Sequence, residues 1–353
     1  MKLLPALIAA LALATPASAQ DRPQWSFAIH GGAGVIERAS LSPEQDAAYR
    51  AALTRALEAG AEVLRNGGEA LDAVQAAIQL MEDDPLFNAG RGAVFTAAGR
   101  NELDAAVMNG ADLTAGAVAG LTTTRHPIAA ARAVMERSPH VMLIGEGADA
   151  FAASVDLEQV APSYFFTERR WRGLERFLTG QSLPIPERPA GAPPAPADGM
   201  AALQPAPPLD ERKFGTVGAV ALDDRGHLAA GTSTGGTNGK RWGRVGDVPV
   251  LGAGTYASDR EGCAVSATGD GEFYIRATVA RDICGRIAAG ATTQDAAQAE
   301  VDDALSLGGS GGVVVMDAAG RPAFALTTSG MYRGMIGPDQ PAWVGIYGDE
   351  PRP

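Results

Sequence analysis

The chain has few of the residues that commonly build disulfide frameworks and zinc sites. Its 353 residues include only two cysteines and four histidines. Two cysteines are too few for the disulfide framework of a small secreted domain. Cys263 lies in a strand-like run and Cys284 in a helix-like run, so we expect two buried thiols rather than a bridge. No two histidines have the spacing of zinc ligands, which disfavours a zinc enzyme.

Basic residues and long apolar runs are also scarce. Lys and Arg number 29 against 41 Asp and Glu, and a formal net charge of -12 argues against general affinity for nucleic acid or anionic membranes. No apolar run reaches the roughly 20 residues that span a bilayer. At the N-terminus, Lys2, a short apolar stretch and the small residues 17–19 resemble a cleaved signal peptide. We therefore predict a signal peptide over 1–19 and an exported, periplasmic protein whose mature chain begins at Gln20, with a retained anchor as the alternative.

Periodicity and turn signals predict alternating groups of strands and helices. A strand over 25–29 leads into a glycine-rich loop over 31–34. The run Ser42-Pro43-Glu44-Gln45 predicts the start of a helix that ends near Gly67. Further helices are expected over 71–81, 127–138, 171–178, 272–289 and 294–305, and strands over 93–96 and 103–108 (as a hairpin), 140–144, 216–222, 228–234, 263–267, 312–316 and 323–326. Because hairpins dominate, we predict an α+β fold, a four-layer αββα sandwich with mostly antiparallel sheets.

A change of composition interrupts this pattern. Residues 182–210 are rich in Pro and Ala and lack periodicity, so we expect a mobile, solvated linker. A linker usually marks a domain boundary, but here an apolar strand begins almost directly after it, at Thr216. We therefore predict one folded domain with the linker inside it.

Threonine and glycine accumulate between positions 215 and 271, at the ends of predicted strands. Small residues let backbone N–H groups reach a ligand, and hydroxyls supply nucleophiles and donors, although tight turns also explain each cluster alone. The stretch 231–240 is not a phosphate loop, because Arg241 follows its Lys where Ser or Thr is required. The G-x-S-x-G elbow of a serine hydrolase is also missing. The remaining route to hydrolysis is a hydroxyl activated by an amine, and an N-terminal threonine supplies both.

Eight segments of the chain follow one another in a characteristic order. They are HGGAG (30–34), PLFNAGRGAVFT (85–96), ELDAAVMNG (102–110), SPHVMLIGEGA (138–148), GTVGAVALD (215–223), GTSTGG (231–236), GRVGDVPVLGAGTYA (243–257) and GGSGG (308–312). Together they resemble the isoaspartyl peptidase/plant-type L-asparaginase family of N-terminal-nucleophile (Ntn) hydrolases. The resemblance implies hydrolysis of the side-chain amide of L-asparagine and of β-aspartyl (isoaspartyl) dipeptides. A glycosylasparaginase and a non-catalytic exported amino-acid-binding protein are the alternatives.

The resemblance further implies that the chain cuts itself between Gly215 and Thr216. The products would be an α subunit (20–215) and a β subunit (216–353), and cleaved protomers would pair as a homodimer. Thr216 would then be the catalytic nucleophile, with its own α-amine as the base. Thr234 and Asn88 match the family residues that lie beside the nucleophile.

Substrate contacts and a metal site are implied in the same way. Arg244 and Asp247 match the residues that bind the α-carboxylate and the α-ammonium of the substrate. Thr268 and Gly269 match the oxyanion donors that also contact the substrate. No catalytic cofactor is implied. A structural sodium ion is implied, held by the main-chain carbonyls of Met81, Glu82, Asp84, Phe87, Ala89 and Arg91.

Three features depart from the family pattern. The Pro-rich linker is longer than the family requires. Asp270 places a carboxylate beside the oxyanion donors, where we expect it to influence the leaving group or the pH profile. Arg91 is bulky, and we expect it to restrict what enters the site.

Overall fold

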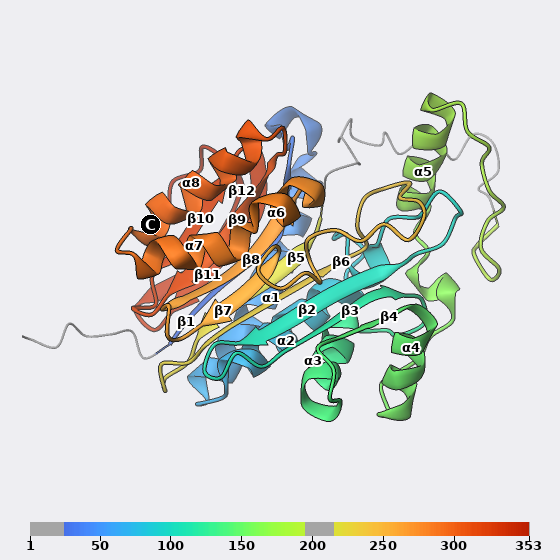
Figure 1. Cartoon of the computed structure of the whole chain (residues 1–353). Helices are drawn as coiled ribbons and strands as arrows, with labels where there is room; N and C mark the ends of the chain where they lie inside the picture. Colours follow the sequence, from blue (N-terminus) through green and yellow to red (C-terminus); the bar gives the residue numbers. More distant parts are fainter. Residues whose placement is uncertain (1–24, 195–214, 353) are drawn as a thin grey trace, which may run out of the picture.

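The computed structural model describes residues 25–194 and 215–352. The predicted signal peptide, with the first residues of the predicted mature chain, and residues 195–210 of the predicted linker lie outside these ranges. Two β-sheets pack face to face, and helices cover both outer faces (Figure 1). The predicted αββα sandwich is therefore confirmed. None of the helices in the described ranges combines the length and the apolar character needed to cross a membrane.

The larger sheet has eight strands and the smaller has four. In the larger sheet lie β1 (Ser26–Gly34), β2 (Leu103–Asn109), β3 (Ala115–Leu121), β4 (Met142–Ile144), β5 (Val217–Leu222), β6 (Leu228–Thr234), β11 (Gly330–Gly337) and β12 (Gln340–Tyr347), and in the smaller β7 (Thr255–Ser258), β8 (Cys263–Gly269), β9 (Gly311–Asp317) and β10 (Pro322–Leu326). Their spatial orders are β12-β11-β1-β5-β6-β2-β3-β4 and β10-β9-β8-β7. Every named neighbour pair is antiparallel except β3 and β4.

The helices form the outer layers. They are α1 (Pro43–Arg65), α2 (Ala70–Asp83), α3 (Pro127–Arg137), α4 (Gly145–Ser154), α5 (Glu168–Gly180), α6 (Gly271–Ala277), α7 (Val279–Ala288) and α8 (Thr293–Ser306). Helices α1, α2 and α3 pack on the larger sheet, and α7 and α8 pack on the smaller one. Helix α5 stands at one end of the molecule, beside the sheets (Figure 1).

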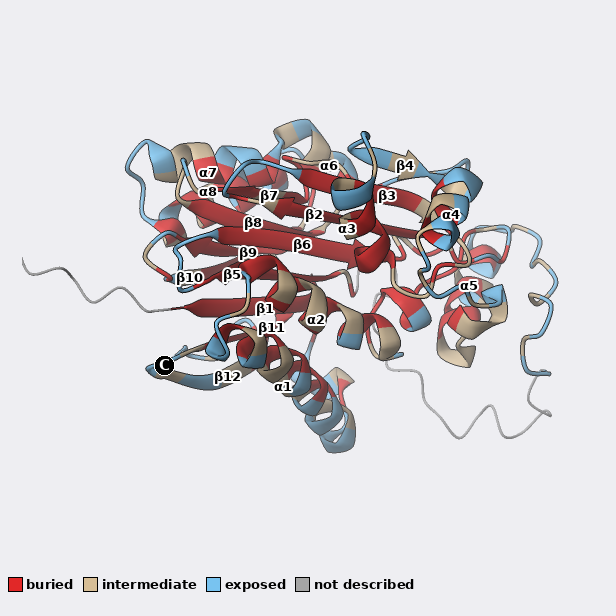
Figure 2. Ribbon diagram, turned by 90° about the horizontal axis from the view of Figure 1, so that it is seen from below, coloured by how far each residue is buried: buried red, intermediate tan, exposed pale blue. Residues whose placement is uncertain are grey.

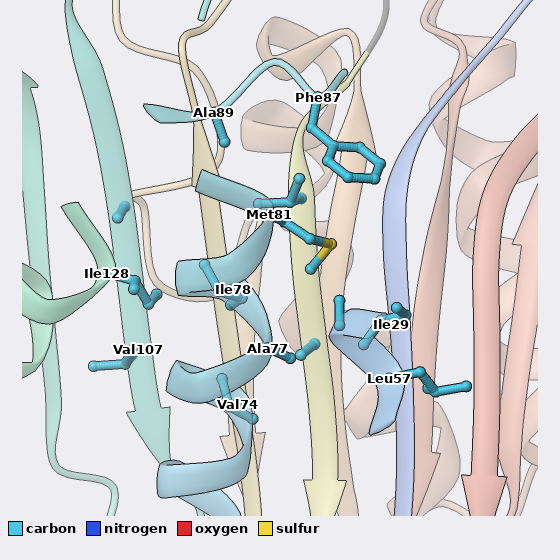
Figure 3. Packing of buried hydrophobic residues seen from close by; sticks show 14 of the residues in the cluster. Ile29, Leu57, Val74, Ala77, Ile78, Met81, Phe87, Ala89, Val107 and Ile128 are labelled. Carbon is cyan, nitrogen blue, oxygen red and sulfur yellow. The ribbon is translucent and has the colours of Figure 1, made fainter. Parts of the chain in front are cut away.

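Local sequence explains where the helices begin and which face they bury. The predicted capping box at the start of α1 is present: Ser42 Oγ accepts from the Gln45 backbone N–H, and Gln45 Oε1 accepts from the Ser42 N–H. Along α2, the apolar residues Val74, Ile78 and Met81 recur at helical spacing and are buried against β5 and β6 (Figure 3). Each such side chain contributes about 1.5–3 kcal/mol to folding.

The central strands are buried on both faces (Figure 2). Every residue of β5, with sequence VGAVAL, is buried between α2 and the smaller sheet. Its pairing with β1 ends at His30–Gly218, and its pairing with β6 ends at Val217–Ser233. Thr216 therefore lies just beyond the last paired residue of a central strand.

Two predicted strand boundaries were wrong near the start of the chain. Residues 31–34 are not a loop but the end of β1, with a register shift between His30 and Gly32. Residues 93–96 do not form a hairpin with 103–108, because β2 pairs with β3 and β6 and only Thr96 makes an isolated bridge, to Lys240. The strand β3, AGAVAGL, was missed because its glycines and alanines carry little strand signal.

Two further differences lie in the second half of the chain. The expected helix over 272–289 is two helices, α6 and α7, because Thr278 takes a left-handed conformation with φ of 51°. The hairpin of β9 and β10 is also not the last one. Strands β11 and β12 follow it and return to the larger sheet beside β1.

Over 182–194, the first part of the predicted linker forms no helix or strand, and it contacts α5 through Arg188. Arg188 forms a two-pronged ion pair with Glu168 of α5, with N–O distances of 2.8 and 2.9 Å. The Arg188 guanidinium also lies over the rings of Phe166 and Trp171. These contacts tie a proline-rich segment to α5 although the segment has no periodicity of its own.

The predicted pair of free thiols is also wrong, because Cys263 and Cys284 form a disulfide. Cys263 begins β8 and Cys284 lies on α7, which packs against β8. This packing brings the Cα atoms to 5.3 Å, within the range of a disulfide. Separate strand and helix assignments give no information on that distance.

We expect the disulfide to stabilise the fold without taking part in chemistry. A Cys263→Ala/Cys284→Ala variant should lose about 3 kcal/mol of unfolding free energy, the amount expected for closing a loop of this length. Denaturant unfolding of both proteins, with and without reductant, measures the difference. An equal midpoint for the oxidised wild type and the variant would contradict a stabilising bridge, and reductant should leave the variant unchanged.

Candidate active site

The predicted site residues converge although they come from distant parts of the sequence. One small cavity is lined by Asn88, Thr216, Thr234, Arg244, Asp247, Thr268 and Gly269, together with Gly236, Thr237, Gly246 and Val248. A larger surface cavity of about 700 Å³ lies at the beginning of β1, and none of the predicted catalytic or substrate-binding residues lines it. The chemistry of the small cavity therefore decides the function.

Two threonine hydroxyls meet at one end of the cavity. Thr216 Oγ1 and Thr234 Oγ1 are 2.9 Å apart. Thr234 Oγ1 also accepts a hydrogen bond of 3.0 Å from the Gly236 backbone N–H. The hydrogen of the Thr234 hydroxyl is thus available for Thr216, and a hydrogen bond of this kind orients Thr216 Oγ1 and favours negative charge on it.

The peptide bond before Thr216 is held in an unusual conformation. Gly215 has φ of 111°, and a Cβ atom there would lie 2.5 Å from the backbone nitrogen of Asn88, so only glycine fits. The Asn88 N–H donates to the Gly215 carbonyl oxygen at 2.8 Å. The Asn88 side chain is itself fixed, since its Nδ2 donates to the Gly236 carbonyl and its Oδ1 accepts from the Val94 N–H. A rigid donor therefore faces the carbonyl next to the Thr216 hydroxyl.

Opposite charges gather at the cavity wall formed by the loop between β6 and β7. Asp247 is buried, and its Oδ2 has no hydrogen-bond partner among the described residues. Burial raises the pKa of the Asp247 carboxyl to about 7. The Arg244 guanidinium donates through Nε and Nη2 to Glu272 at 2.9 and 3.0 Å. A Cβ at Gly271 would lie 2.9 Å from Asp247 Oδ1 and 3.0 Å from Arg244 Nη2, so the two charged groups approach each other at this glycine.

Sequence reasoning missed a buried ion pair behind this wall. Lys240 Nζ lies 3.8 Å from Asp104 Oδ2 and donates to the Glu102 carbonyl at 2.9 Å. Both side chains are almost fully buried. Asp104 is paired in register with Thr234, so the ion pair directly adjoins the threonine pair. A lysine within a loop-like glycine-rich run gives no sign in the sequence that it is buried.

Thr268 and Gly269 end β8 at the cavity, where the smaller sheet meets the larger one. Thr268 Oγ1 accepts a long contact of 3.4 Å from the Ala33 N–H of β1, which leaves the hydroxyl hydrogen for another acceptor. Asp270 is not among the lining residues. Its Oδ2 accepts from the Ser310 N–H and hydroxyl, so it ties the 308–312 segment to the end of β8. Arg91 also lies outside the lining, with its guanidinium 5.7 Å from the Tyr164 ring centroid.

The loop after α2 contains the carbonyl groups that the family resemblance assigns to a sodium ion. Residue Pro85, four positions after Met81, has no N–H to continue the helix, and the Leu86 N–H donates to Asp84 Oδ1 instead. The Asp84 and Ala89 carbonyls accept from the Phe87 and Gly92 N–H groups, so they are partly engaged. In the described residues, no group of three His, Cys, Asp or Glu side chains could hold a metal ion.

Comparison with known proteins extends the likeness to nearly the whole chain. A family model described as asparaginase matches residues 23–346. The isoaspartyl peptidase of Salmonella typhimurium is 47% identical over 328 residues, covering 92% of this chain and 96% of the relative. The isoaspartyl peptidase of Escherichia coli is 47% identical over 328 residues, with 92% and 94% covered. The isoaspartyl peptidase/L-asparaginase of Mus musculus is 38% identical over 304 residues, with 86% and 85% covered.

Proposed function

Because the chain belongs to the asparaginase family, we propose that it is an isoaspartyl peptidase/L-asparaginase, an enzyme that hydrolyses the side-chain amide of L-asparagine and of β-aspartyl dipeptides. The proposal rests on the groups that meet in the small cavity. A single cavity holds the hydrogen-bonded pair Thr216 and Thr234 together with the Arg244 guanidinium and the buried Asp247 carboxylate, whose Oδ2 has no partner in the described part of the chain. These groups match a small zwitterion with a reactive carbonyl at its far end.

The enzyme first makes its nucleophile by cutting itself. Thr216 Oγ1 attacks the Gly215 carbonyl carbon, the C–N bond breaks, and the hydroxyl proton passes to the departing nitrogen. The acyl group has then moved from nitrogen to oxygen as an ester. The Asn88 N–H, already bound to the Gly215 oxygen at 2.8 Å, stabilises the negative charge that develops there. Water then hydrolyses the ester. The products are a new carboxylate on Gly215 and a free α-amine on Thr216, which begins the β subunit.

The same hydroxyl then acts on the substrate. The Thr216 α-amine takes the hydroxyl proton as Oγ1 attacks the side-chain carbonyl, and the oxyanion receives hydrogen bonds from the Thr268 hydroxyl and the Gly269 N–H. The amine product leaves with a proton from the α-ammonium, and water cleaves the resulting aspartyl ester. An α-amine has a reference pKa of about 7.7–8.0, which suits a base near neutral pH.

Substrate recognition follows from the charges that remain unsatisfied. The ammonium group of the substrate pairs with Asp247, whose Oδ2 has no other partner among the described residues. The carboxylate binds Arg244, which presents Nη1 beyond the two nitrogens used by Glu272. An aspartyl unit without the α-ammonium leaves the buried Asp247 Oδ2 without a partner among the described residues, and one without the α-carboxylate loses its contact with Arg244. We therefore expect both to be refused.

We also propose a structural sodium ion in the loop after α2. The proposed ligands are the main-chain carbonyls of Met81, Glu82, Asp84, Phe87, Ala89 and Arg91, and the missing N–H of Pro85 leaves the Met81 carbonyl without a helical donor. The ion would stabilise the loop that carries Asn88 and would take no part in catalysis. Thermal unfolding in sodium and in tetramethylammonium buffers tests this, and identical midpoints would contradict it.

Two further proposals concern the state and location of the enzyme. Export to the periplasm is supported by the signal-like N-terminal sequence and by the disulfide, which persists in oxidising compartments. A homodimer of cleaved protomers is supported by the edge strand β4, where Met142 and Ile144 are exposed, and by the exposed Val141 just before it. Cell fractionation with sequencing of the mature N-terminus tests the first, and light scattering of the purified protein tests the second. A cytoplasmic full-length chain and a monomer are the contrary results.

Self-cleavage and the loss of the Thr216 hydroxyl test the assignment of the nucleophile. The wild type should run on a denaturing gel as two fragments, and N-terminal sequencing of the smaller one should begin at Thr216. Thr216→Ala removes the attacking hydroxyl, so it should give one folded, uncut and inactive chain. An uncut wild type with full activity, or a new terminus elsewhere, would refute the assignment.

The pH dependence of kcat/KM tests the role of Asp247 in substrate binding. With a pKa of about 7, the Asp247 carboxyl is neutral below pH 7 and ionised above it, and only the ionised form attracts an ammonium group. Bound substrate keeps Asp247 ionised, so this ionisation should affect kcat/KM but not kcat. As the pH falls below about 6, log kcat/KM should decrease with a slope of about 2, because Asp247 and the α-amine of the free enzyme both gain protons. In the substrate complex only the α-amine gains a proton, so log kcat should decrease with a slope of about 1.

Asp247→Asn is the matched variant for this experiment. It should lower kcat/KM for L-asparagine by about 30-fold or more, because the substrate ammonium loses its partner, and should reduce the slope to about 1. Equal slopes for kcat and kcat/KM in the wild type would contradict the role of Asp247.

A further inference from the structure

The HGGAG segment at 30–34 contains a histidine that the hydrolytic steps above do not use. His30 lies on β1 and is fully buried. Its Nδ1 is 3.0 Å from the Thr216 carbonyl oxygen, and its Nε2 is 2.8 Å from Ser266 Oγ on β8. One imidazole therefore joins the proposed nucleophile residue to the smaller sheet.

These contacts determine which nitrogen carries the proton. A carbonyl oxygen can only accept, so Nδ1 must donate to Thr216. Nε2 is then the acceptor, and the Ser266 hydroxyl donates to it. Burial lowers the pKa of His30 to about 3, so the ring stays neutral and keeps one donor and one acceptor at every working pH.

Further buried hydroxyls orient Ser266. Ser266 Oγ lies 2.6 Å from Thr232 Oγ1 of β6, and Thr255 Oγ1 of β7 donates to Thr232 at 2.7 Å. When each hydroxyl donates to the next, the hydrogen bonds form a continuous path from Thr255 through Thr232 and Ser266 to His30. Buried networks in which every member has a partner hold their groups rigidly.

Thr216 needs side-chain contacts of this kind because the backbone pairing of the β-sheet does not extend to it. The last β5 pairs are His30–Gly218 and Val217–Ser233. Before cleavage, the bond from Asn88 to the Gly215 carbonyl also anchors the main chain at this point. That carbonyl leaves Thr216 on cleavage, and the contact of His30 with the Thr216 carbonyl remains.

We propose that His30 is a positioning residue for the nucleophile of the mature enzyme. Its Nδ1–H holds the Thr216 carbonyl, and this fixes the rotation of the main chain that carries both the α-amine and Oγ1. The inference rests on the proposed function, in which the amine must reach the hydroxyl proton. A misplacement of about 1 Å in such a pair costs roughly 100-fold in rate.

Two substitutions distinguish the hydrogen bond from His30 to the Thr216 carbonyl from a role of the ring in packing alone. The side-chain amide of His30→Asn places an N–H near the position of Nδ1, whereas that of His30→Gln reaches the position of Nε2 and loses the contact with Thr216. In self-cleaved enzyme, His30→Gln should lower kcat for L-asparagine about 100-fold with KM within about threefold. His30→Asn should recover kcat to within about tenfold of the wild type. His140→Gln, at an exposed histidine, is the control and should leave both constants unchanged.

Equal losses in both His30 variants, a loss confined to KM, or an unchanged kcat in His30→Gln would overturn the proposal. If His30→Gln fails to fold or to cut itself, nitrogen-15 NMR of wild-type histidines gives an independent answer. His30 should show the neutral Nδ1–H tautomer without titrating from pH 5 to 9, and an Nε2–H tautomer or a titrating ring would overturn the proposal. A wild type that is active and begins at Thr216 upholds the proposed function whichever result His30 gives.

Discussion

The architecture of the site depends on the point where the strand ladder ends. The pairing of β5 with β6 ends at Val217 and its pairing with β1 ends at Gly218, so Thr216 lies just before the first paired residue. A nucleophile paired within a β-strand would be rigid but could not become a chain terminus. A nucleophile in an unpaired loop would lack a fixed side-chain orientation. Thr216 lies between these cases: side chains from β1 and β6 and a main-chain N–H from the loop after α2 hold it and the peptide bond before it. In the proposed mechanism, the same geometry serves both self-cleavage and the later hydrolysis.

Charge balance around the cavity explains why a small zwitterion fits. Arg244 and Lys240 carry two positive charges, and Asp104, Asp247 and Glu272 can carry three negative ones. Three of these carboxylates and cations are almost fully buried, where an unpaired charge is costly. A zwitterion adds no net charge, and in the proposed complex its ammonium group pairs with Asp247 while its carboxylate binds Arg244 through Nη1. In the proposed function, selectivity for the aspartyl unit thus comes from charges that gain their partners only when substrate binds.

Sequence reasoning predicted the layers, the helix caps and the residues of the cavity, because periodicity, capping motifs and ordered family segments are local in the chain. It failed where the outcome depends on distances between segments. The disulfide of Cys263 and Cys284 and the ion pair of Lys240 arise only when separate elements pack together. The bend at Thr278 and the docking of Arg188 on α5 are likewise tertiary effects. The part played by His30 was missed for the same reason, since its partners lie 186 and 236 residues away.

The central claim is that the hydroxyl of an N-terminal Thr216 forms the covalent bond to the substrate. Rapid acid quenching of the self-cleaved enzyme during turnover of a slow β-aspartyl substrate, followed by mass spectrometry, tests it most directly. We expect an aspartyl ester on the fragment that begins at Thr216, mapped by peptide fragmentation to that residue alone. An aspartyl adduct on any other residue, or on the fragment that ends at Gly215, would contradict it.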